Sequence, residues 1–265
     1  MFDSFQLNRS KPFSIKVDLT SGSYFHRFPA SDQALISSYL ANKKELSSSS
    51  PLITATLQID QNGVHAYLHE LKKPFNLSYI QGDIGRRAQQ GKEALCKVTG
   101  ASRGEVITII DGTAGLCREA YLMSSCGAKV IAYERCLPIY LLAKYAILES
   151  TAPINLQFTN TMDVKHILAD VVYLDPMFPK TKKNAAVGKE AMVLRGFAEQ
   201  DQGLDEQELL NWALDHAECR VVVKRPLKAS PLALQTPTSS VRGKAIRFDI
   251  YGKKKLPKRQ INQLN

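Results

Sequence analysis

Hydrophobic and polar positions follow two different patterns along the chain. In the first zone, 13–19 (FSIKVDL) and 52–59 (LITATLQI) alternate with a period of two residues, which is typical of half-buried strands. The dipeptide Asn62-Gly63 then predicts a tight hairpin to a further strand. A helix is expected over 31–46, between the strands. Residues 1–80 are therefore predicted to form a small β-rich N-terminal subdomain that also holds a helix.

In the second zone, strongly apolar stretches alternate with helix patterns. The stretch 105–111 (EVITIID) is rich in β-branched residues and lacks alternation, as expected for a parallel strand covered on both faces. Five more strands are predicted, at 129–134, 155–160, 170–175, 220–225 and 245–252. Helices are predicted at 83–98, 116–126, 138–150 and 204–217. Strands that alternate with helices form a doubly wound parallel α/β sheet, which we expect in a domain of residues 81–265 with a basic tail.

Composition narrows the class of protein. A chain of 265 residues with 44% hydrophobic residues can bury a core without disulfides or metal. The five cysteines are odd in number and form no CxxC pair, which argues against a disulfide framework and a zinc ribbon. His65 and His69 lie in a strand pattern, where four residues span about 13 Å, too far for a shared metal. No apolar run approaches the ~20 residues that span a bilayer, so we expect a soluble, cytoplasmic protein with no metal and no membrane contact.

Positive charge is in excess and is concentrated in two segments. Lys and Arg number 35 against 25 Asp and Glu, a net charge of +10. The basic segments are 180–195 and 242–259. Such runs also occur on solvated faces, but the presence of two of them in one chain favours RNA or DNA as the partner. The expected phosphate contacts are Arg86, Arg87, Lys180, Lys182, Lys183, Arg225, Arg242 and Lys244, although a solvated helix face explains Arg86 and Arg87 nearly as well.

Two strand ends are candidates for a cofactor site, because ligands of open α/β sheets bind beyond the carboxyl ends of the strands. The first strand ends at Asp111 and leads into a turn with Gly112 and Gly115, which permit close approach of the backbone, although GxxG also occurs in ordinary turns. The second ends at Glu134, 23 positions later, near the ~20-residue spacing at which an acidic residue binds ribose hydroxyls. Because a full GxGxxG is absent, a dinucleotide has no evident pyrophosphate cradle. S-adenosylmethionine (SAM), which has no phosphate, is the favoured cofactor.

A third carboxylate, Asp163, follows the strand predicted at 155–160. It is placed to accept a hydrogen bond from the adenine amino group of the cofactor. An isolated Asp after a strand is also typical of a helix N-cap, so both interpretations stay open.

The stretch 175–179 (DPMFP) is the most specific in the chain. An exocyclic amine of a nucleobase is a poor nucleophile because its lone pair is delocalised into the ring, so a methyltransferase must present acceptors to its N–H groups. Asp175 and the carbonyl of Pro176 suit this role, and Phe178 offers a ring face for a base extruded from its stack. The alternative is a proline-stiffened loop with a core phenylalanine.

Five stretches together resemble the ribosomal RNA small subunit methyltransferase J family. They are 111–120 (DGTAGLCREA), 132–135 (AYER), 171–179 (VVYLDPMFP), 220–226 (RVVVKRP) and 247–251 (RFDIY). The resemblance implies a class I, Rossmann-like, seven-stranded methyltransferase that converts SAM to S-adenosylhomocysteine (SAH). It also implies methylation of the N2 amine of a guanosine near the 3′ end of 16S rRNA, with that RNA or the 30S subunit as the partner.

The resemblance assigns cofactor contacts to particular residues, which join Asp111 and Gly115. They are Arg118, Glu119, Glu134, Arg135, Met162, Asp163 and Asp175. The chain departs from the family's usual residues at several of these places. Cys117 stands where the family usually has Gly, Glu119 where it has Asp, and Met162-Asp163 where it has small hydroxyl residues.

Alternatives remain open at this stage. The motif chemistry does not separate guanine N2 from adenine N6 or cytosine N4, and only the resemblance makes that choice. A nicotinamide-dependent oxidoreductase would share the glycine turn and Glu134, but it would need a pyrophosphate cradle and a Tyr-Lys or His proton relay. A non-catalytic RNA-binding module would explain the charge but not the motif at 175–179.

Overall fold

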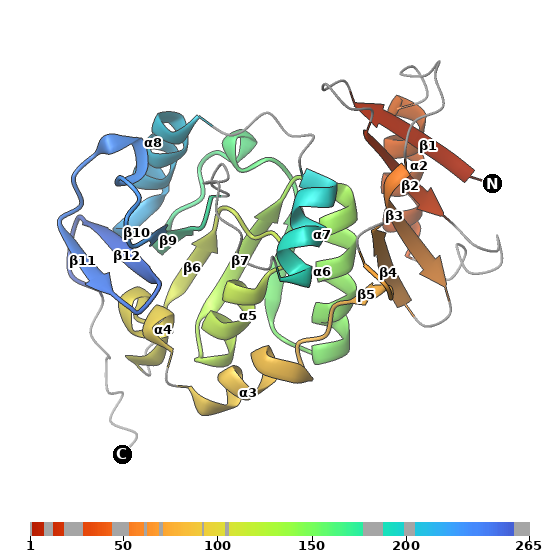
Figure 1. Cartoon of the computed structure of the whole chain (residues 1–265). Helices are drawn as coiled ribbons and strands as arrows, with labels where there is room; N and C mark the ends of the chain where they lie inside the picture. Colours follow the sequence, from red (N-terminus) through yellow and green to blue (C-terminus); the bar gives the residue numbers. More distant parts are fainter. Residues whose placement is uncertain are drawn as a thin grey trace. The chain divides into compact units, whose positions relative to one another are not determined.

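The structure is a computed structural model that describes residues 2–7, 13–18, 29–43, 53–60, 63–68, 71–91, 93–103, 106–176, 188–198 and 205–256. These form two compact units (Figure 1). One unit contains Met1–Leu77, Cys136–Ala146 and Lys182–Gln202, and the other contains Ser78–Arg135, Ile147–Thr181 and Gly203–Asn265. The N-terminal stretch of the first unit ends at Leu77, close to the predicted subdomain boundary at residue 80. The unit also includes two short segments from later in the chain.

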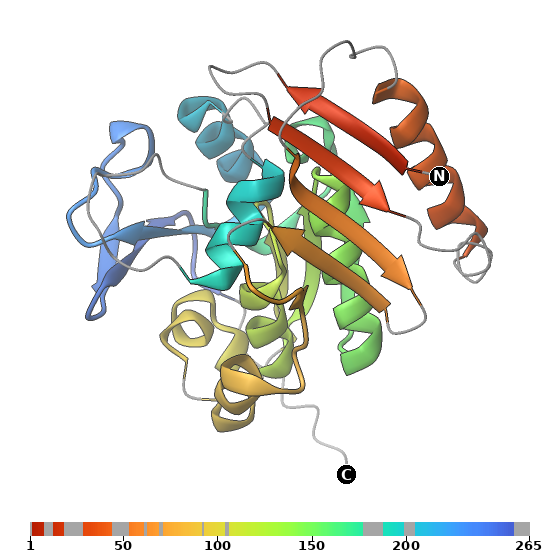
Figure 2. The same ribbon diagram turned by 45° about the vertical axis from the view of Figure 1, so that its right-hand side comes forward.

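The first unit is built on a five-stranded sheet, whose strands lie side by side in Figure 2. Its strands, in spatial order, are β1 (Phe2–Leu7), β2 (Phe13–Asp18), β3 (Ile53–Asp60), β4 (Gly63–Leu68) and β5 (Phe75–Asn76). Among the described strands of this sheet, β2 and β3 pair in parallel and the other neighbours pair antiparallel. β3 and β4 pair up to Asp60 and Gly63, which confirms the predicted hairpin.

Three helices contribute to the first unit. They are α2 (Ala30–Lys43), the first part of α6 (Leu137–Ser150), and α7 (Lys189–Ala198). The α2 residue Asp32 is 1% exposed, and its carboxylate accepts hydrogen bonds from Lys144 Nζ at 2.5 Å and Tyr145 Oη at 2.9 Å on α6. α7 packs against β3, β4 and β5. The charged residues of α7 obscured its helical pattern in the sequence.

The second unit contains the seven-stranded sheet that the resemblance implies. Its strands, in spatial order, are β11 (Ser239–Arg242), β12 (Ile246–Gly252), β10 (Ala217–Pro226), β9 (Ala169–Leu174), β6 (Thr108–Asp111), β7 (Lys129–Glu134) and β8 (Ile154–Phe158). β12 is antiparallel to β10 and β11, whereas the pairs from β10 to β8 are parallel. The predicted parallel α/β class is therefore correct, with an antiparallel edge.

The strand order fixes where a ligand site can lie. From β6 the chain continues to β7 and β8 on one side, and then returns to β9 on the other side of β6. The carboxyl ends of β6 and β9 therefore flank the point where the strand order reverses, which is where open α/β sheets bind ligands. Buried β-branched residues hold these central strands, among them Ile109, Ile110, Val171 and Val172.

Helices cover this sheet. α5 (Arg118–Ser125) packs on β7 and β8, and α8 (Glu206–His216) packs on β9 and β10 (Figure 1). Asp205 caps α8 by accepting hydrogen bonds from the N–H groups of Gln207 and Glu208. Within the described ranges, no helix is long and apolar enough to cross a membrane.

The prediction of one continuous helix over 83–98 is wrong, because the structure has two helices there. The structure has α3 (Gly82–Gln90) and α4 (Ala94–Thr99). Gly91 adopts φ = 59°, and its N–H donates to the carbonyls of Arg87 and Ala88, which ends α3. A left-handed glycine at this position is a common helix stop, and the apolar pattern on either side obscured it.

Candidate active site at the ends of β6, β7 and β9

The turn after β6 is fastened to both neighbouring strands. The N–H of Gly112 donates to the carbonyl of Tyr173 on β9 at 3.0 Å, and the N–H of Ala114 donates to the carbonyl of Tyr133 on β7 at 3.2 Å. Asp111 itself is 1% exposed and accepts a hydrogen bond from the N–H of Thr113. Burial, reinforced by nearby carboxylates, raises the pKa of Asp111 well above its usual value. Asp111 therefore stabilises the turn from inside.

The two glycines of this turn are required for different reasons. A Cβ on Gly112 would lie 3.0 Å from Leu174 Cδ2 and 3.1 Å from a ring carbon of Trp212, so Gly112 permits close packing of the turn onto the core. Gly115 has φ = 52°, a left-handed conformation that favours glycine. Cys117 has the same φ of 52° although it carries a side chain. Two residues of the turn, Gly115 and Cys117, thus adopt a left-handed conformation before α5 begins at Arg118.

Asp175 follows β9 directly and is joined to the turn after β6. Its N–H donates to Thr113 Oγ1 at 2.6 Å, so the connections that follow β6 and β9 meet where the strand order reverses. Pro176, the next residue, is half-buried. Phe178 and the predicted phosphate contacts Lys180, Lys182 and Lys183 lie outside the described residues.

Lys224, which belongs to the stretch 220–226 but was not among the predicted site residues, lies at the centre of this arrangement. Lys224 on β10 extends its Nζ to 2.6 Å from Asp175 Oδ2 and 2.6 Å from Glu119 Oε1 on α5. Burial alone would lower the pKa of Lys224, but the two carboxylates raise it above its usual value. The signal available in the sequence was its place at the carboxyl end of the strand next to β9.

Asp175 has an unusual acidity as a result of these neighbours. Burial raises the pKa of Asp175 to about 6, with a further upward contribution from Glu119, although the Lys224 ammonium opposes both. The carboxyl group therefore changes its charge close to neutral pH. Groups with such displaced pKa values, lying beside a turn of this kind, are frequent at active sites.

The ends of β7 and β8 complete the group of acidic residues. Glu134 ends β7 and is buried, and its charge contributes to the raised pKa of Asp111. After β8, a short 3₁₀ turn is capped by the side chain of Asn160, which accepts from the N–H of Met162. The capping residue is therefore Asn160 and not Asp163, which is exposed at the end of this turn. Met162 packs against the core of the unit.

Comparison with known proteins agrees with this geometry. The pattern of the SAM-dependent methyltransferase family SAM_MT matches residues 39–253. A protein from Alcanivorax borkumensis, named ribosomal RNA small subunit methyltransferase J, is 38% identical over 188 residues, which cover 67% of this chain and 75% of the relative. This chain belongs to the ribosomal RNA small subunit methyltransferase J family. A member from Mannheimia succiniciproducens is 34% identical over 233 residues, covering 80% of this chain and 92% of the relative.

A solved structure supports the assignment of the fold. A SAM-dependent methyltransferase from Neisseria gonorrhoeae superposes with a TM-score of 0.61 at 26% identity, and the match covers 90% of this chain and 94% of the other. As a member of the methyltransferase J family, the protein is a class I methyltransferase that uses SAM. The predicted fold, cofactor and enzyme class are confirmed.

The residues at the strand ends fit SAM. Its sulfonium and ammonium groups are cationic, and the carboxylates of Glu119, Glu134 and Asp175 all lie close enough to Asp111 to raise its pKa. The first turn of α5 has no side-chain cap. Arg118 lies 3.9 Å from the carboxylate of Asp83 on α3, and Arg135 follows Glu134 and is half-buried.

The basic residues expected to meet phosphate separate into two groups. The prediction that Arg225 contacts phosphate at the surface is wrong. Its side chain is buried, with 4% exposed, and it donates hydrogen bonds to Glu206 and to the carbonyl of Ser230. Arg87 forms a bidentate ion pair with Glu93, with both hydrogen bonds at 2.8 Å, and this pair raises the pKa of Arg87. Of the predicted phosphate contacts that the structure describes, Arg86, Arg242 and Lys244 are exposed.

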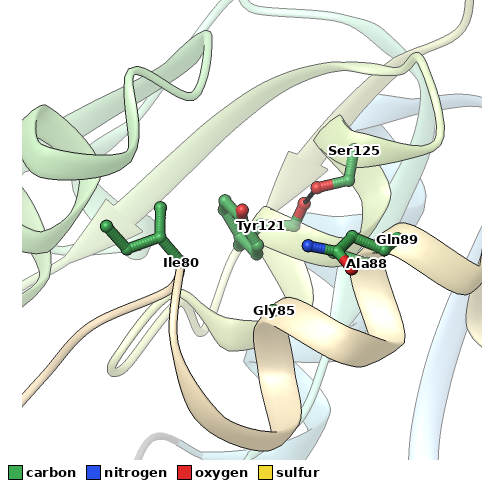
Figure 3. Close-up of a pocket in the computed structure, with 6 residues that line it drawn as sticks. All are labelled: Ile80, Gly85, Ala88, Gln89, Tyr121 and Ser125. Atoms are coloured by element: carbon green, nitrogen blue, oxygen red, sulfur yellow. Dashed lines mark hydrogen bonds between the residues drawn. The ribbon is translucent and has the colours of Figure 1, made fainter.

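Two cavities of the second unit are lined by residues that the structure describes. One, of about 270 Å³, is lined by Lys224, Glu119 and Tyr173 and by residues of α4, β11 and β12. The other, of about 250 Å³, lies between α3 and α5, where Figure 3 shows the ring of Tyr121 between Ile80 and Gln89. Among the described residues, the lining of this second cavity includes no charged side chain and none of the predicted site residues. The first cavity is therefore the one that adjoins the candidate active site.

Proposed function

We propose that this protein transfers a methyl group from SAM to the N2 amine of a guanosine near the 3′ end of 16S rRNA. The observation that carries the proposal is the position of Asp175, a carboxylate at the end of β9 that is bonded through its N–H to the turn after β6. In a doubly wound sheet this is the place where a substrate meets a cofactor bound across the strand ends.

The chemical roles follow from the acidity of Asp175. When bound, SAM supplies a methyl group on a positively charged sulfur, which becomes a neutral thioether on transfer. Asp175 accepts a hydrogen bond from the amine, so that the nitrogen lone pair is directed away from the carboxylate. As the C–N bond forms, the nitrogen becomes positively charged and strongly acidic. The carboxylate, with a pKa of about 6, is basic enough to take the released proton.

Cofactor binding is assigned to the acidic residues and their neighbours. Glu134 is proposed to accept hydrogen bonds from the ribose hydroxyls, and Asp163 from the adenine amino group. Asp111 and Gly115 shape the turn, and Arg118, Glu119, Arg135 and Met162 complete the contacts that the family resemblance implies. The carbonyl of Pro176 and the ring of Phe178 are proposed to receive the flipped base.

The choice of RNA and of guanine rests on the family. Relatives carry the name ribosomal RNA small subunit methyltransferase J, and the net charge of +10 suits an RNA partner. We therefore propose 16S rRNA, free or within the 30S subunit, as the partner, and the cytoplasm as the compartment. Arg86, Lys180, Lys182, Lys183, Arg242 and Lys244 are proposed phosphate contacts, and no metal ion is assigned a role.

A label-transfer experiment tests this function. The enzyme and methyl-labelled SAM are incubated with undermethylated 30S subunits and, in parallel, with free 16S rRNA. We expect label in N2-methylguanosine near the 3′ end after nuclease digestion. Label in N6-methyladenosine or N4-methylcytidine would instead assign another exocyclic amine, and SAH binding without any transfer to RNA would contradict the proposal.

A further inference from the structure

Lys224 bridges two acidic residues that come from different elements. It projects from β10 and contacts Glu119 on α5 and Asp175 after β9, each at 2.6 Å. The three side chains are 23%, 27% and 29% exposed, so all of them are largely withdrawn from water. Partial burial strengthens an ion pair because water screens it less.

The contact leaves one oxygen of Asp175 available. Lys224 donates a hydrogen bond to Oδ2. Among the described residues, no side chain or backbone group donates a hydrogen bond to Oδ1. A carboxylate held at one oxygen has its rotation restricted, so its second oxygen points in a fixed direction. This is what an acceptor for a nucleobase amine requires.

We propose that Lys224 is a positioning residue for methyl transfer, which orients Asp175 and maintains its negative charge while leaving Oδ1 for the substrate amine. The inference deepens the proposed function and rests on it for the identity of the amine. Lys224 itself touches neither the amine nor the methyl group in this scheme.

The charges around Asp175 make this role necessary. Glu119 on α5 disfavours the ionised form of Asp175, while Asp111 on β6 and Tyr173 on β9 both have pKa values that the Asp175 charge raises. Glu134 on β7 adds to the same acidic environment through Asp111. Without the ammonium group, burial and these neighbours would keep Asp175 protonated at neutral pH, and a protonated carboxyl group cannot take up the proton that the amine must release.

The decisive measurement is the titration of Asp175 in the protein without cofactor. Aspartate labelled with ¹³C at the carboxyl carbon is followed by NMR, and the Asp175 signal is assigned by its loss in Asp175→Asn. We expect a midpoint near the value of about 6 in the native protein. In Lys224→Met the midpoint should rise by about 1 to 3 units, and in Lys224→Arg it should return close to the native value.

A second variant, with the opposite expected effect on the titration midpoint of Asp175, keeps the test decisive if Lys224→Met does not fold. Glu119→Gln removes a negative neighbour, so the Asp175 midpoint should fall. The matched control is Lys129→Met, because Lys129 is exposed at the amino end of β7, at the opposite edge of the sheet, and should leave the midpoint unchanged. An unchanged midpoint in folded Lys224→Met, or in Glu119→Gln, overturns the proposal.

The kinetic consequence is a displaced pH profile. At pH 7, Lys224→Met should transfer methyl groups about 2- to 100-fold more slowly than the native enzyme, and the deficit should shrink at pH 9, with restoration in Lys224→Arg. A constant deficit at every pH would mean a purely structural role. Because the NMR titration needs no RNA, failure of the native enzyme to methylate guanosine would refute the proposed function and leave the test of Lys224 intact.

Discussion

At the scale of single residues, Asp175 and Cys117 depend on different physical effects. Asp175 needs its neighbours, because burial favours its neutral form and Lys224 opposes this effect. At Cys117 the energetic cost lies in the residue's own backbone, which has φ = 52°. A side chain in this conformation costs roughly 1–2 kcal/mol relative to glycine.

Asp175→Ala tests the acceptor role. Loss of the carboxylate should lower the transfer rate by about 10²- to 10⁴-fold, as for removal of a group that handles protons, while SAH affinity measured by calorimetry stays within about tenfold. The control is Asp215→Ala, because Asp215 is exposed on α8. Equal losses of affinity and rate would instead make Asp175 mainly a cofactor ligand.

The pH dependence of the native enzyme follows from the same group. The active form is the carboxylate, which is present above the pKa of about 6 and is lost below it. The transfer rate with saturating substrates should therefore be flat above pH 7 and fall about tenfold per pH unit well below 6. A rate that stays constant down to pH 4.5 would be incompatible with proton uptake by Asp175.

Cys117 offers a test of backbone strain. Cys117→Gly relieves the left-handed conformation but loses a fully buried side chain, so the free energy of unfolding in urea should change by less than about 1 kcal/mol. Cys117→Val places a β-branched side chain in that conformation and should destabilise by about 2 kcal/mol or more. Similar stabilities for the two variants would show that strain at this position is small.

At the scale of elements, glycines decide where helices end and how closely they pack. α3 ends at Gly91, and the N-terminal part of the same helix approaches the chain at Ile80, where a Cβ on Gly85 would lie 2.8 Å from the Ile80 carbonyl oxygen. Backbone atoms cannot move aside as a flexible side chain can. The two glycines therefore predict different costs on substitution.

Gly85→Ala and Gly91→Ala form a matched pair on α3. Gly91 has open space around it but φ = 59°, so Gly91→Ala should destabilise by about 1 kcal/mol. Gly85→Ala forces α3 away from Ile80 and should cost more, about 2–3 kcal/mol. Urea unfolding measures both, and an unaffected Gly85→Ala would contradict the close packing.

Several elements could be predicted from the sequence, and those that could not have physical causes. β7 and β12 were predicted within one residue of their bounds, because a short run rich in apolar and aromatic residues is typical of a buried strand. β11 was missed because all four of its residues are exposed and carry no apolar pattern. In the site, Asp175 was found through its motif, whereas Lys224 was not, because only the alignment of β10 beside β9 brings its ammonium group to that carboxylate.

At the scale of the whole molecule, the net charge of +10 should govern encounter with RNA. Arg242 and Lys244 are exposed in and just after β11. Replacing both with Ala should weaken binding to rRNA and reduce the slope of log affinity against log salt by roughly 0.7–0.9 per lost phosphate contact. Lys129→Ala is the control, and filter binding at several salt concentrations is the measurement. An unchanged slope would remove these two residues from the interface.

Lys224 and Arg225 are consecutive, yet one faces Glu119 and Asp175 while the other is buried against Glu206. Adjacent residues of a strand point to opposite sides, so a slip of β10 by one position would exchange their surroundings. The pairing of Val223 with both Leu174 and Asp249 prevents that slip. Catalytic competence should therefore depend on β12 as well as on β9, and a chain that lacks Ile246–Gly252 should hold Lys224 beside Asp175 less reliably and transfer methyl groups more slowly.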